Sequence, residues 1–508
     1  MPQFNYGQLG IIVNQSVKGT LFTYIGVVLG FATTGILLPR ICSTDEVGLL
    51  KILVAYSSLI ATFGTLGING VTIRLFPYFN NEEKKHQGYL ANLILVGILG
   101  FLLTTLLIVL FKPLLVELNI NKSALFIKYI NYLIILVFFQ IFFSLLDAYY
   151  SALLNSVHGT FLKEVFQRIL IIISIGLYFF NYIDFHQFVL FYIASISTLT
   201  IYITITLILK KHFSLHTNFK FLTRELLISI GSISLFGILN GFSMIIIQNV
   251  DTIMLTSMVG LGGTGVYSVC FYFGLMVSLP ARSILKIVNI VTAQAWKEND
   301  LNLISKIYSK SCLTLFIIGL LLFIGLCANI DNIFHILGPF GSDYESGKWV
   351  IFFIGLSSLI DMITGANGII IGTSKFYKIQ TVFMLILVFL LVITNLLLIP
   401  VLGISGAALG SAISLAVLNL LRYLFLYFKY NMQPFDKQFV IVAIIGASSY
   451  FLSTILPVQS NYVADTIIRS TILIILFCTP IYYLKVSSDI NAKAEDLLKM
   501  FRFNKMVP

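Results

Sequence analysis

Four basic residues lie at or just beyond the ends of long apolar segments, where they could bind an anionic group. They are Lys18, Arg74, Arg282 and Lys286. Guanidinium groups bind phosphate oxygens through paired hydrogen bonds, and ammonium groups bind them as compact charges. If these side chains converge from different helices, they form a positively charged vestibule able to hold a pyrophosphate. In the competing interpretation, each cation only anchors its segment at a membrane surface.

Acidic residues inside apolar segments are a second group with possible chemistry. Asp361 lies near the middle of the segment 349–371, and an ionisable group at that depth costs a few kcal/mol unless it is paired or faces water. It could couple transport to H⁺ or Na⁺, gate a substrate, or serve only as a structural hydrogen-bond partner. Asp147 lies near the end of one segment and Arg168 begins the next. We expect these two to form an ion pair, with a coupling or gating role as the alternative.

Catalytic and metal-binding motifs are absent from the sequence. It contains no H-E-x-x-H, no G-x-S-x-G and no phosphate-binding loop of the Walker type. The five cysteines are scattered without a C-x-x-C pair, which indicates neither a disulfide framework nor a zinc site. The sequence therefore predicts a protein without a cofactor that is not an enzyme.

The elements that must position these residues are membrane-spanning helices. Residues of apolar type make up 58% of the 508, and only 10% are charged, against about 25% in soluble domains. The apolar runs are longer than the roughly ten residues of a barrel strand, so they predict helices. Fourteen such runs are found, at 18–38, 47–71, 89–111, 129–154, 168–183, 187–209, 226–249, 255–279, 311–330, 349–371, 377–399, 404–428, 438–456 and 466–484.

The distribution of basic residues predicts the orientation of these spans. With an even number of spans, both termini share one side of the membrane, and most of the 32 Lys and Arg residues fall on that side. By the positive-inside rule, the termini are cytoplasmic. The net charge of +11 is explained in this way without nucleic-acid binding.

A weak internal repeat divides the chain. Ile36-Leu37-Leu38 followed by Gly48 matches Ile253-Met254-Leu255 followed by Gly265, 217 residues further on. The match predicts two six-helix lobes with a substrate path near mid-membrane, as in other transporters built from repeats. The expected parts are residues 1–209, residues 210–430, an additional helix pair at 431–485 and a basic cytoplasmic tail at 486–508.

Several motifs made of Gly, Pro and small apolar residues resemble those of a known group. That group is the polysaccharide-flippase branch of the multidrug/oligosaccharidyl-lipid/polysaccharide exporter superfamily. The matching motifs extend over nearly the whole chain. They are Gly26-x-x-x-Gly30 with Leu38-Pro39, Asp45-Glu46-Val47-Gly48-Leu49-Leu50, Asp251-x-x-Met254-Leu255 with Gly265-Val266-Tyr267, and Ile399-Pro400-Val401-Leu402-Gly403-Ile404-Ser405-Gly406-Ala407-Ala408.

This resemblance implies a V-shaped, pseudo-twofold transporter in the bacterial cytoplasmic membrane. It would move a polyprenyl-pyrophosphate-linked oligosaccharide from the inner to the outer leaflet by alternating access, for the synthesis of cell-surface polysaccharide. Membrane lipids and a polysaccharide polymerase or ligase are the partners that follow. The first span departs from lipid II flippases, because it carries no charge inside it and only Lys18 at its edge.

Three alternatives share parts of this pattern. A cation-coupled multidrug exporter of the same superfamily typically has twelve spans and an acidic residue in the first, which this chain lacks. A major-facilitator carrier has a charged, Gly- and Arg-rich loop after its second span, unlike residues 74–79 here. A membrane glycosyltransferase or polymerase usually needs a long outer loop. The outer loop at residues 331–348 is short, and its acidic residues are Asp331, Asp343 and Glu345.

Overall fold

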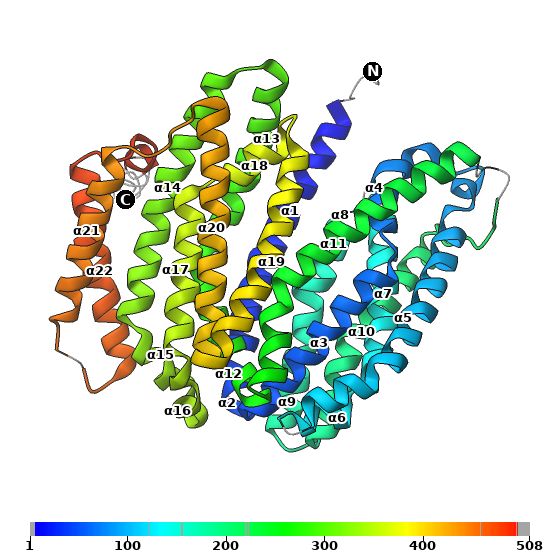
Figure 1. The fold of residues 1–508 in the computed structure, drawn as a ribbon, viewed down its shortest axis with the longest axis horizontal. Coiled ribbons are helices and arrows are strands. Elements are labelled where there is room, and N and C mark those ends of the chain that lie inside the picture. The colour runs from blue at the N-terminus through cyan, green and yellow to red at the C-terminus, as the bar shows by residue number, and fades with distance from the viewer. Residues whose placement is uncertain are drawn as a thin grey trace, which may run out of the picture. The chain divides into compact units, whose positions relative to one another are not determined.

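The computed structural model describes residues 6–120, 122–153, 156–218, 221, 223–457, 459–493 and 495, and all regular structure within them is helical (Figure 1). In this part of the chain, 13 helices are long and apolar enough to cross a membrane. The protein is therefore a multi-pass integral membrane protein, as the sequence predicts. Most of the predicted tail at 486–508 lies outside the described residues.

The difference between 13 and the fourteen predicted spans lies in the fifth segment. There α8 (Ser156–Phe161), the π-helical η3 (Leu162–Phe166) and α9 (Gln167–Phe179) follow one another without a break. Every 18-residue stretch of this run contains Lys163, Glu164 and Arg168, so the run is more charged than the 13 candidate spans. The helical run also begins before the expected residue 168, which places Glu164 inside it and not in a connecting loop.

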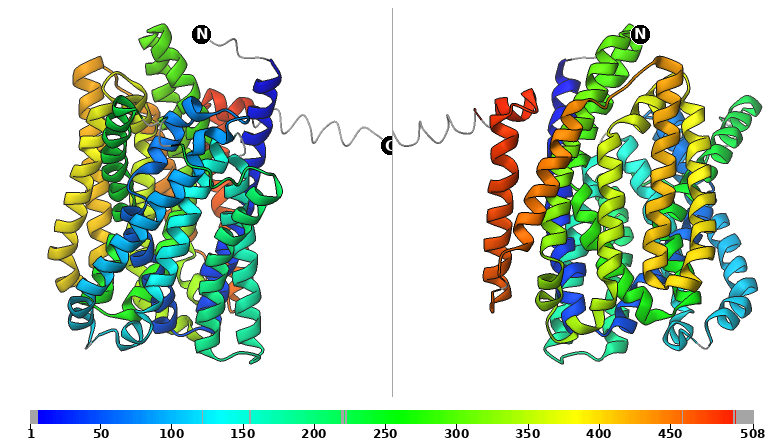
Figure 2. Two further views of the ribbon diagram at one scale, coloured as in Figure 1. Left: turned by 90° about the vertical axis from the view of Figure 1, so that its right-hand side faces the viewer. Right: turned by 60° about the vertical axis from the view of Figure 1, so that its left-hand side comes forward.

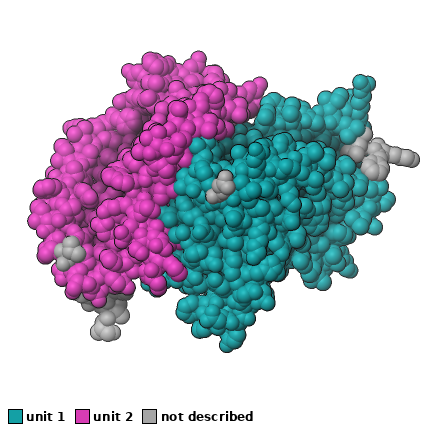
Figure 3. All heavy atoms as spheres, turned by 60° about the horizontal axis from the view of Figure 1, so that its bottom comes forward, with its two compact units in different colours: residues 1–268 teal, residues 269–508 magenta. Residues whose placement is uncertain are grey.

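The chain forms two compact units, Met1–Ser268 and Val269–Pro508, which Figure 3 shows in separate colours. The first unit extends past the repeat boundary expected at residue 209. The reason is that α11 (Arg224–Met258) packs along α3 (Thr44–Gly64) and α4 (Ile68–Phe79). The division into lobes at residue 209 remains a prediction.

Helices of the first unit surround an aromatic and aliphatic core. Buried side chains of α4, α5, α7 and α10 form it, among them Phe76, Tyr89, Ile141, Tyr149 and Ile203. The remaining elements of this unit are α1 (Tyr6–Gly30), η1 (Phe31–Leu37), α2 (Leu38–Ile41), η2 (Lys85–Gly88), α5 (Tyr89–Asn119), α6 (Ala124–Tyr129), α7 (Tyr132–Ala152), α10 (Phe185–Leu209) and most of α12 (Leu261–Leu275).

The second predicted span is a discontinuous helix. A capping box of Ser43 and Glu46 starts α3, and the helix stops after Gly64. Leu66 and Gly67 then adopt φ values of 49° and 71°, and α4 continues the span. A Cβ on Gly67 would lie 2.1 Å from the Ser234 carbonyl oxygen of α11, so only glycine permits this approach.

The two glycines of the sequence repeat meet in space. A Cβ on Gly48 of α3 would lie 2.1 Å from the Leu261 carbonyl oxygen, and a Cβ on Gly265 of α12 would lie 2.0 Å from the Thr44 carbonyl oxygen. Thr44 and Leu261 are also 217 residues apart, the same separation as between Gly48 and Gly265. Each glycine therefore contacts the residue that is equivalent to the other glycine's partner. Reciprocal contacts of this kind are those expected at a local twofold axis.

The second unit contains a second discontinuous helix and the last helix pair. The span at 349–371 is divided at Gly365 (φ 58°) into α17 (Lys348–Thr364) and α18 (Asn367–Thr373). α21 (Lys437–Thr454) and α22 (Tyr462–Tyr483) pack side by side (Figure 2). The other elements are η5 (Met276–Ser278), α13 (Ala281–Glu298), α14 (Leu301–Ala328), α15 (Ile330–Ile336), η6 (Gly338–Phe340), α16 (Gly341–Tyr344), η7 (Glu345–Gly347), α19 (Tyr377–Leu402) and α20 (Ile404–Tyr430).

We predict that Gly48→Ala destabilises the protein, because the added methyl group would overlap the backbone of α12. Overpacking of this kind costs about 1–3 kcal/mol. The measurement is thermal unfolding of the purified protein, followed by size-exclusion chromatography after heating. Gly231→Ala is the matched control, since a Cβ at Gly231 in α11 meets no atom within 4 Å. Equal melting temperatures for both variants would contradict the close contact.

Candidate functional site

A cavity of about 740 Å³, lined by polar and apolar side chains, lies inside the first unit. Its wall is formed by α3, α4, α7, α10, α11 and the run from α8 to α9. This size is within the range of small-molecule binding sites. Hydroxyl and amide groups line it in a chain with a mean hydropathy of +0.97: Ser58, Thr62, Asn69, Gln140, Ser144 and Ser151. The cavity can therefore hold water or a hydrogen-bonding ligand at membrane depth.

Two side-chain hydrogen bonds join the helices around this cavity. Asn69, just after the break in the second span, donates from Nδ2 to Ser144 Oγ of α7 at 2.7 Å. Gln140 Nε2 of α7 donates to Ser57 Oγ of α3 at 2.9 Å. The Oδ1 atom of Asn69 is buried and has no hydrogen-bond partner. It is an acceptor that a ligand or water in the cavity could use.

Asp147 brings a carboxylate to the same cavity. It projects from α7 against Gly159 of α8, where a Cβ would lie 1.8 Å from Asp147 Oδ1. That oxygen is buried and has no hydrogen-bond partner. Lys163 lines the cavity too and interacts electrostatically with Asp147. The carboxylate is thus placed where a proton, a cation or an amine could reach it.

The predicted ion pair between Asp147 and Arg168 is wrong. Arg168 Nη2 instead donates to Glu164 Oε2 at 3.0 Å, and both side chains are about three-quarters buried. Glu164 lies four residues before Arg168 on one helical run, so the two face each other locally. Sequence reasoning missed this pair because it began the fifth span at residue 168. A Cβ on Gly26 of α1 would lie 2.5 Å from Glu164 Oε2, so α1 packs against the pair.

The four predicted phosphate-binding cations lie on three helices and are exposed. Lys18 is on α1 and Arg74 is on α4, whereas Arg282 and Lys286 occupy successive turns of α13, as their spacing predicts. None of the four is among the described residues that line the 740 Å³ cavity. Their convergence into one vestibule remains a prediction.

In the second unit, Asp361 belongs to a polar cluster around the break between α17 and α18. Asn419 of α20 donates from Nδ2 to Asp361 Oδ1 at 3.1 Å. Asn367, at the start of α18, donates from Nδ2 to Asn419 Oδ1 at 3.1 Å. Asn419 of α20 therefore links Asp361, before the break, to Asn367, after the break.

Arg422 completes this cluster and was not identified from the sequence as a site residue. It is 6% exposed and interacts electrostatically with Asp361. A Cβ on Gly368 of α18 would lie 3.1 Å from Arg422 Cζ, so the guanidinium group fills the space that this glycine leaves. Ser411, Asn419 and Arg422 recur at a spacing that places them on one helix face, and this periodicity could have revealed a buried polar stripe.

Comparisons with known proteins agree with the resemblance found in the sequence. A family model described as "Polysaccharide biosynthesis protein" matches residues 16–290, more than half of the chain. An uncharacterized membrane protein of Methanocaldococcus jannaschii is 23% identical over 451 residues, covering 86% of this chain and 87% of the relative.

Solved structures of the same fold cover most of the chain. The lipid II flippase MurJ in an inward closed conformation matches with a TM-score of 0.71 and 14% identity, over 94% of this chain and 100% of MurJ. An inward-facing multidrug resistance transporter of the MATE family matches with a TM-score of 0.61 and 14% identity, over 78% of this chain and 93% of that transporter. A MOP superfamily transporter from Pyrococcus furiosus matches with a TM-score of 0.54 and 13% identity, over 82% of this chain and 94% of that transporter. The fold is therefore that of MOP-superfamily transporters.

We predict that water reaches the cavity of the first unit. In a cysteine-free background, Thr62→Cys and Ser151→Cys should react with a membrane-impermeant methanethiosulfonate reagent, because both positions line the polar cavity. The measurement is the mass added after labelling in membranes made permeable to the reagent. Leu106→Cys on the apolar exposed surface of α5 is the control and should remain unlabelled. Unreactive cysteines at both cavity positions would contradict a hydrated cavity.

Proposed function

Since the chain belongs to the polysaccharide biosynthesis protein family, we propose that it is a flippase for a polyprenyl-pyrophosphate-linked oligosaccharide. It moves this substrate from the inner to the outer leaflet of a bacterial cytoplasmic membrane by alternating access, for the synthesis of cell-surface polysaccharide. The observation that carries the proposal is the polar cavity inside a membrane-spanning unit of this fold. Membrane lipids and a polysaccharide polymerase or ligase are the partners it implies.

The chemistry of the substrate requires such a cavity. Sugar hydroxyls and a charged pyrophosphate cannot cross hydrocarbon without hydrogen-bonding and charged partners, because each unpaired polar group costs several kcal/mol there. Asn69, Gln140 and Ser144 supply donors and acceptors for the sugar hydroxyls, and the charged residues of the lining are Lys163, Asp147 and Glu164. The polyprenyl tail has no need of this cavity and can remain in the bilayer.

The pyrophosphate is assigned to Lys18, Arg74, Arg282 and Lys286. Their exposure leaves these side chains accessible to a ligand that enters from the membrane surface. Arg282 and Lys286 share one helix, one turn apart, which suits two oxygens of a single phosphate chain.

The predicted topology supports cytoplasmic termini. We propose that the helical run 156–179 is the fourteenth span, since it is continuous and would be long enough to cross a bilayer. The reciprocal Gly48 and Gly265 contacts support two related six-span halves, residues 1–209 and 210–430, followed by an additional pair. An even number of spans then places both termini on the basic, cytoplasmic side.

Discontinuous helices support an alternating-access mechanism. Each unit contains one, broken at residues 65–67 in the first and at Gly365 in the second. In transporters, broken helices place free backbone groups at substrate or ion sites and provide positions that bend. Here each break lies beside a polar group, Asn69 in one case and Asp361 in the other.

A cation-coupled multidrug exporter of the same superfamily is the second candidate. The observation that favours it is the unpaired carboxylate oxygen of Asp147, which could accept a proton or pair with an organic cation in the cavity. The two candidates predict different consequences of removing the gene.

The decisive experiment is deletion of the gene. A flippase predicts that lipid-linked glycan accumulates on the inner leaflet and that surface polysaccharide is lost. The readout is the enzymatic accessibility of the lipid-linked glycan in inside-out and right-side-out vesicles. Normal glycan export together with increased drug sensitivity would instead identify the multidrug exporter.

Complementation of the deletion strain tests the pyrophosphate site. Arg74→Gln and Arg282→Gln should each abolish glycan export at normal membrane abundance, because each removes a charge that binds phosphate. Lys84→Gln after α4 and Lys297→Gln on α13 are matched controls and should restore export, since both are exposed cations outside the proposed site. Export that is unchanged by both arginine variants would reduce these residues to topological anchors.

We further predict that Asp361 couples transport to an ion gradient. Its carboxylate is exposed, accepts a hydrogen bond from a neutral amide and faces the charge of the buried Arg422. Asp361→Asn keeps the size of the side chain but removes the carboxylate, so glycan export should lose its dependence on the proton or sodium gradient. Asp343→Asn, an exposed acid in the short α16, is the control. An unchanged gradient response in Asp361→Asn would assign this residue a structural role.

A further inference from the structure

A second cavity, of about 460 Å³, lies where five helices of the second unit end. It is lined by the C-terminal ends of α14 and α21 and the N-terminal ends of α15, α17 and α22. Its lining combines aromatic rings with both signs of charge: Trp349, Phe352 and Tyr450 with Asp331, Lys348, Asp465 and Arg469. The transport cycle proposed above uses none of these groups.

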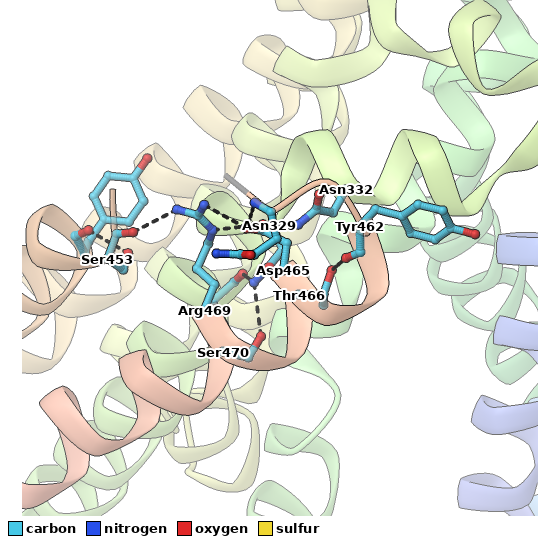
Figure 4. A network of polar contacts seen from close by, with 11 residues as sticks. Asn329, Asn332, Ser453, Tyr462, Asp465, Thr466, Arg469 and Ser470 are labelled. Carbon is cyan, nitrogen blue, oxygen red and sulfur yellow. Dashed lines mark hydrogen bonds and ion pairs between the residues drawn. The ribbon is translucent and has the colours of Figure 1, made fainter. Parts of the chain in front are cut away.

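The base of this cavity is a rigid, buried ion pair. Arg469 donates from Nε to Asp465 Oδ2 and from Nη2 to Asp465 Oδ1, both at 3.2 Å, and the two side chains are only 9% and 5% exposed (Figure 4). Asn332 Nδ2 of α15 donates to Asp465 Oδ2 at 2.7 Å, and Arg469 Nη1 donates to the Ser453 carbonyl oxygen of α21 at 2.8 Å. The pair thus joins α15, α21 and α22, so the polar groups stay in place without a ligand.

The rim of the cavity carries a second ion pair that a ligand can exchange for its own charges. Lys348 Nζ and Asp331 Oδ1 are 2.6 Å apart, with side chains 52% and 77% exposed. Exposed pairs of this kind contribute about 0–1 kcal/mol. Tyr450 interacts electrostatically with both partners, and Trp349 beside Lys348 is 58% exposed.

The charge balance identifies the class of ligand. Two cations and two carboxylates line the cavity, so its net charge is zero. A dianionic pyrophosphate would meet as much repulsion as attraction, whereas a zwitterion with one phosphate and one amine can pair with both signs. Aromatic faces such as those of Trp349 and Tyr450 also attract an ammonium group.

The surroundings of the cavity favour an amphiphile over a free, water-soluble zwitterion. Phe451 and Ile455 beside the end of α21, and Ile467 and Ile468 of α22, expose 45–66% of their surface. Trp and Tyr at helix ends are typical of the level of lipid headgroups. A polar cavity bordered by an apolar outer surface can hold a headgroup while the acyl chains lie along the helices.

We propose that this cavity binds the headgroup of an amine-bearing zwitterionic phospholipid. Its phosphate lies between Lys348 and Arg469, and its ammonium group lies between Asp331 and the rings of Trp349 and Tyr450. Because the site holds α15, α17, α21 and α22, the bound lipid tethers the last helix pair to its unit. This assignment does not depend on which substrate the protein transports.

The chain has two tryptophans, which makes a direct binding test possible. Trp296→Phe leaves Trp349 as a single fluorophore at the rim of the cavity. The full-length variant, in a polyoxyethylene detergent, is titrated with dihexanoyl-phosphatidylethanolamine. We expect a saturable change in emission, whereas dihexanoyl-phosphatidylglycerol, which lacks the amine, should bind about tenfold more weakly.

Two variants at the rim test which residue binds the ammonium group and which binds the phosphate. Asp331→Asn should weaken the binding of phosphatidylethanolamine about three- to tenfold and leave the binding of phosphatidylglycerol unchanged. The variant should therefore no longer prefer phosphatidylethanolamine. Lys348→Met should weaken both lipids, because it removes a partner of the phosphate. Lys310→Met and Asp489→Asn are matched controls, since they break an exposed ion pair of similar geometry, 2.7 Å long, outside this cavity.

Three outcomes would overturn the proposal. They are the absence of a saturable response to phosphatidylethanolamine, equal or tighter binding of phosphatidylglycerol or of farnesyl pyrophosphate, and responses in Asp331→Asn and Lys348→Met that match those of the two controls. Rim residues are mostly exposed, so these variants should fold. Size-exclusion profiles confirm this before the titrations are interpreted.

Discussion

The absence of water in the bilayer interior is the constraint on which the rest of this structure depends. A helix satisfies its own backbone, so the places where helices break require another source of hydrogen bonds. This chain breaks its helices at residues 65–67 and at Gly365, beside the polar residues Asn69 and Asp361. The helix breaks and the polar groups therefore occur together. Irregular backbone lies where polar side chains or a hydrated cavity can supply hydrogen bonds.

Glycines determine where charges can be buried. Asp147 lies against Gly159, Glu164 against Gly26 and Arg422 against Gly368. In each case the missing side chain lets a neighbouring helix bring an ionisable group close to the backbone. A methyl group at Gly159 or Gly26 would overlap the carboxylate. These small residues therefore position the charges as much as the charged residues do, and Gly26 belongs to one of the motifs found in the sequence.

The two units contain different kinds of polar site. The cavity of the first unit is lined by hydroxyl, amide and apolar side chains together with Asp147, Lys163 and Glu164, and it suits a hydrogen-bonding substrate. The second unit buries Arg422 in a compact cluster with Asp361, whose carboxylate accepts a hydrogen bond from Asn419. Because one fold includes a lipid II flippase and multidrug transporters, this local chemistry, and not the fold, has to decide the substrate.

The sequence by itself determined that the chain crosses the membrane many times as helices and resembles MOP-superfamily polysaccharide flippases. Hydropathy and charge are properties of successive residues, so they can be read without coordinates. It also pointed to Gly48 and Gly265 as equivalent, and to Asp147 and Asp361 as unusual. Only the tertiary structure decided that Arg168 pairs with Glu164, that Arg422 is buried and that Asp147 faces a cavity. Partners and burial depend on which helix faces meet, and that is set by packing between segments far apart in the sequence.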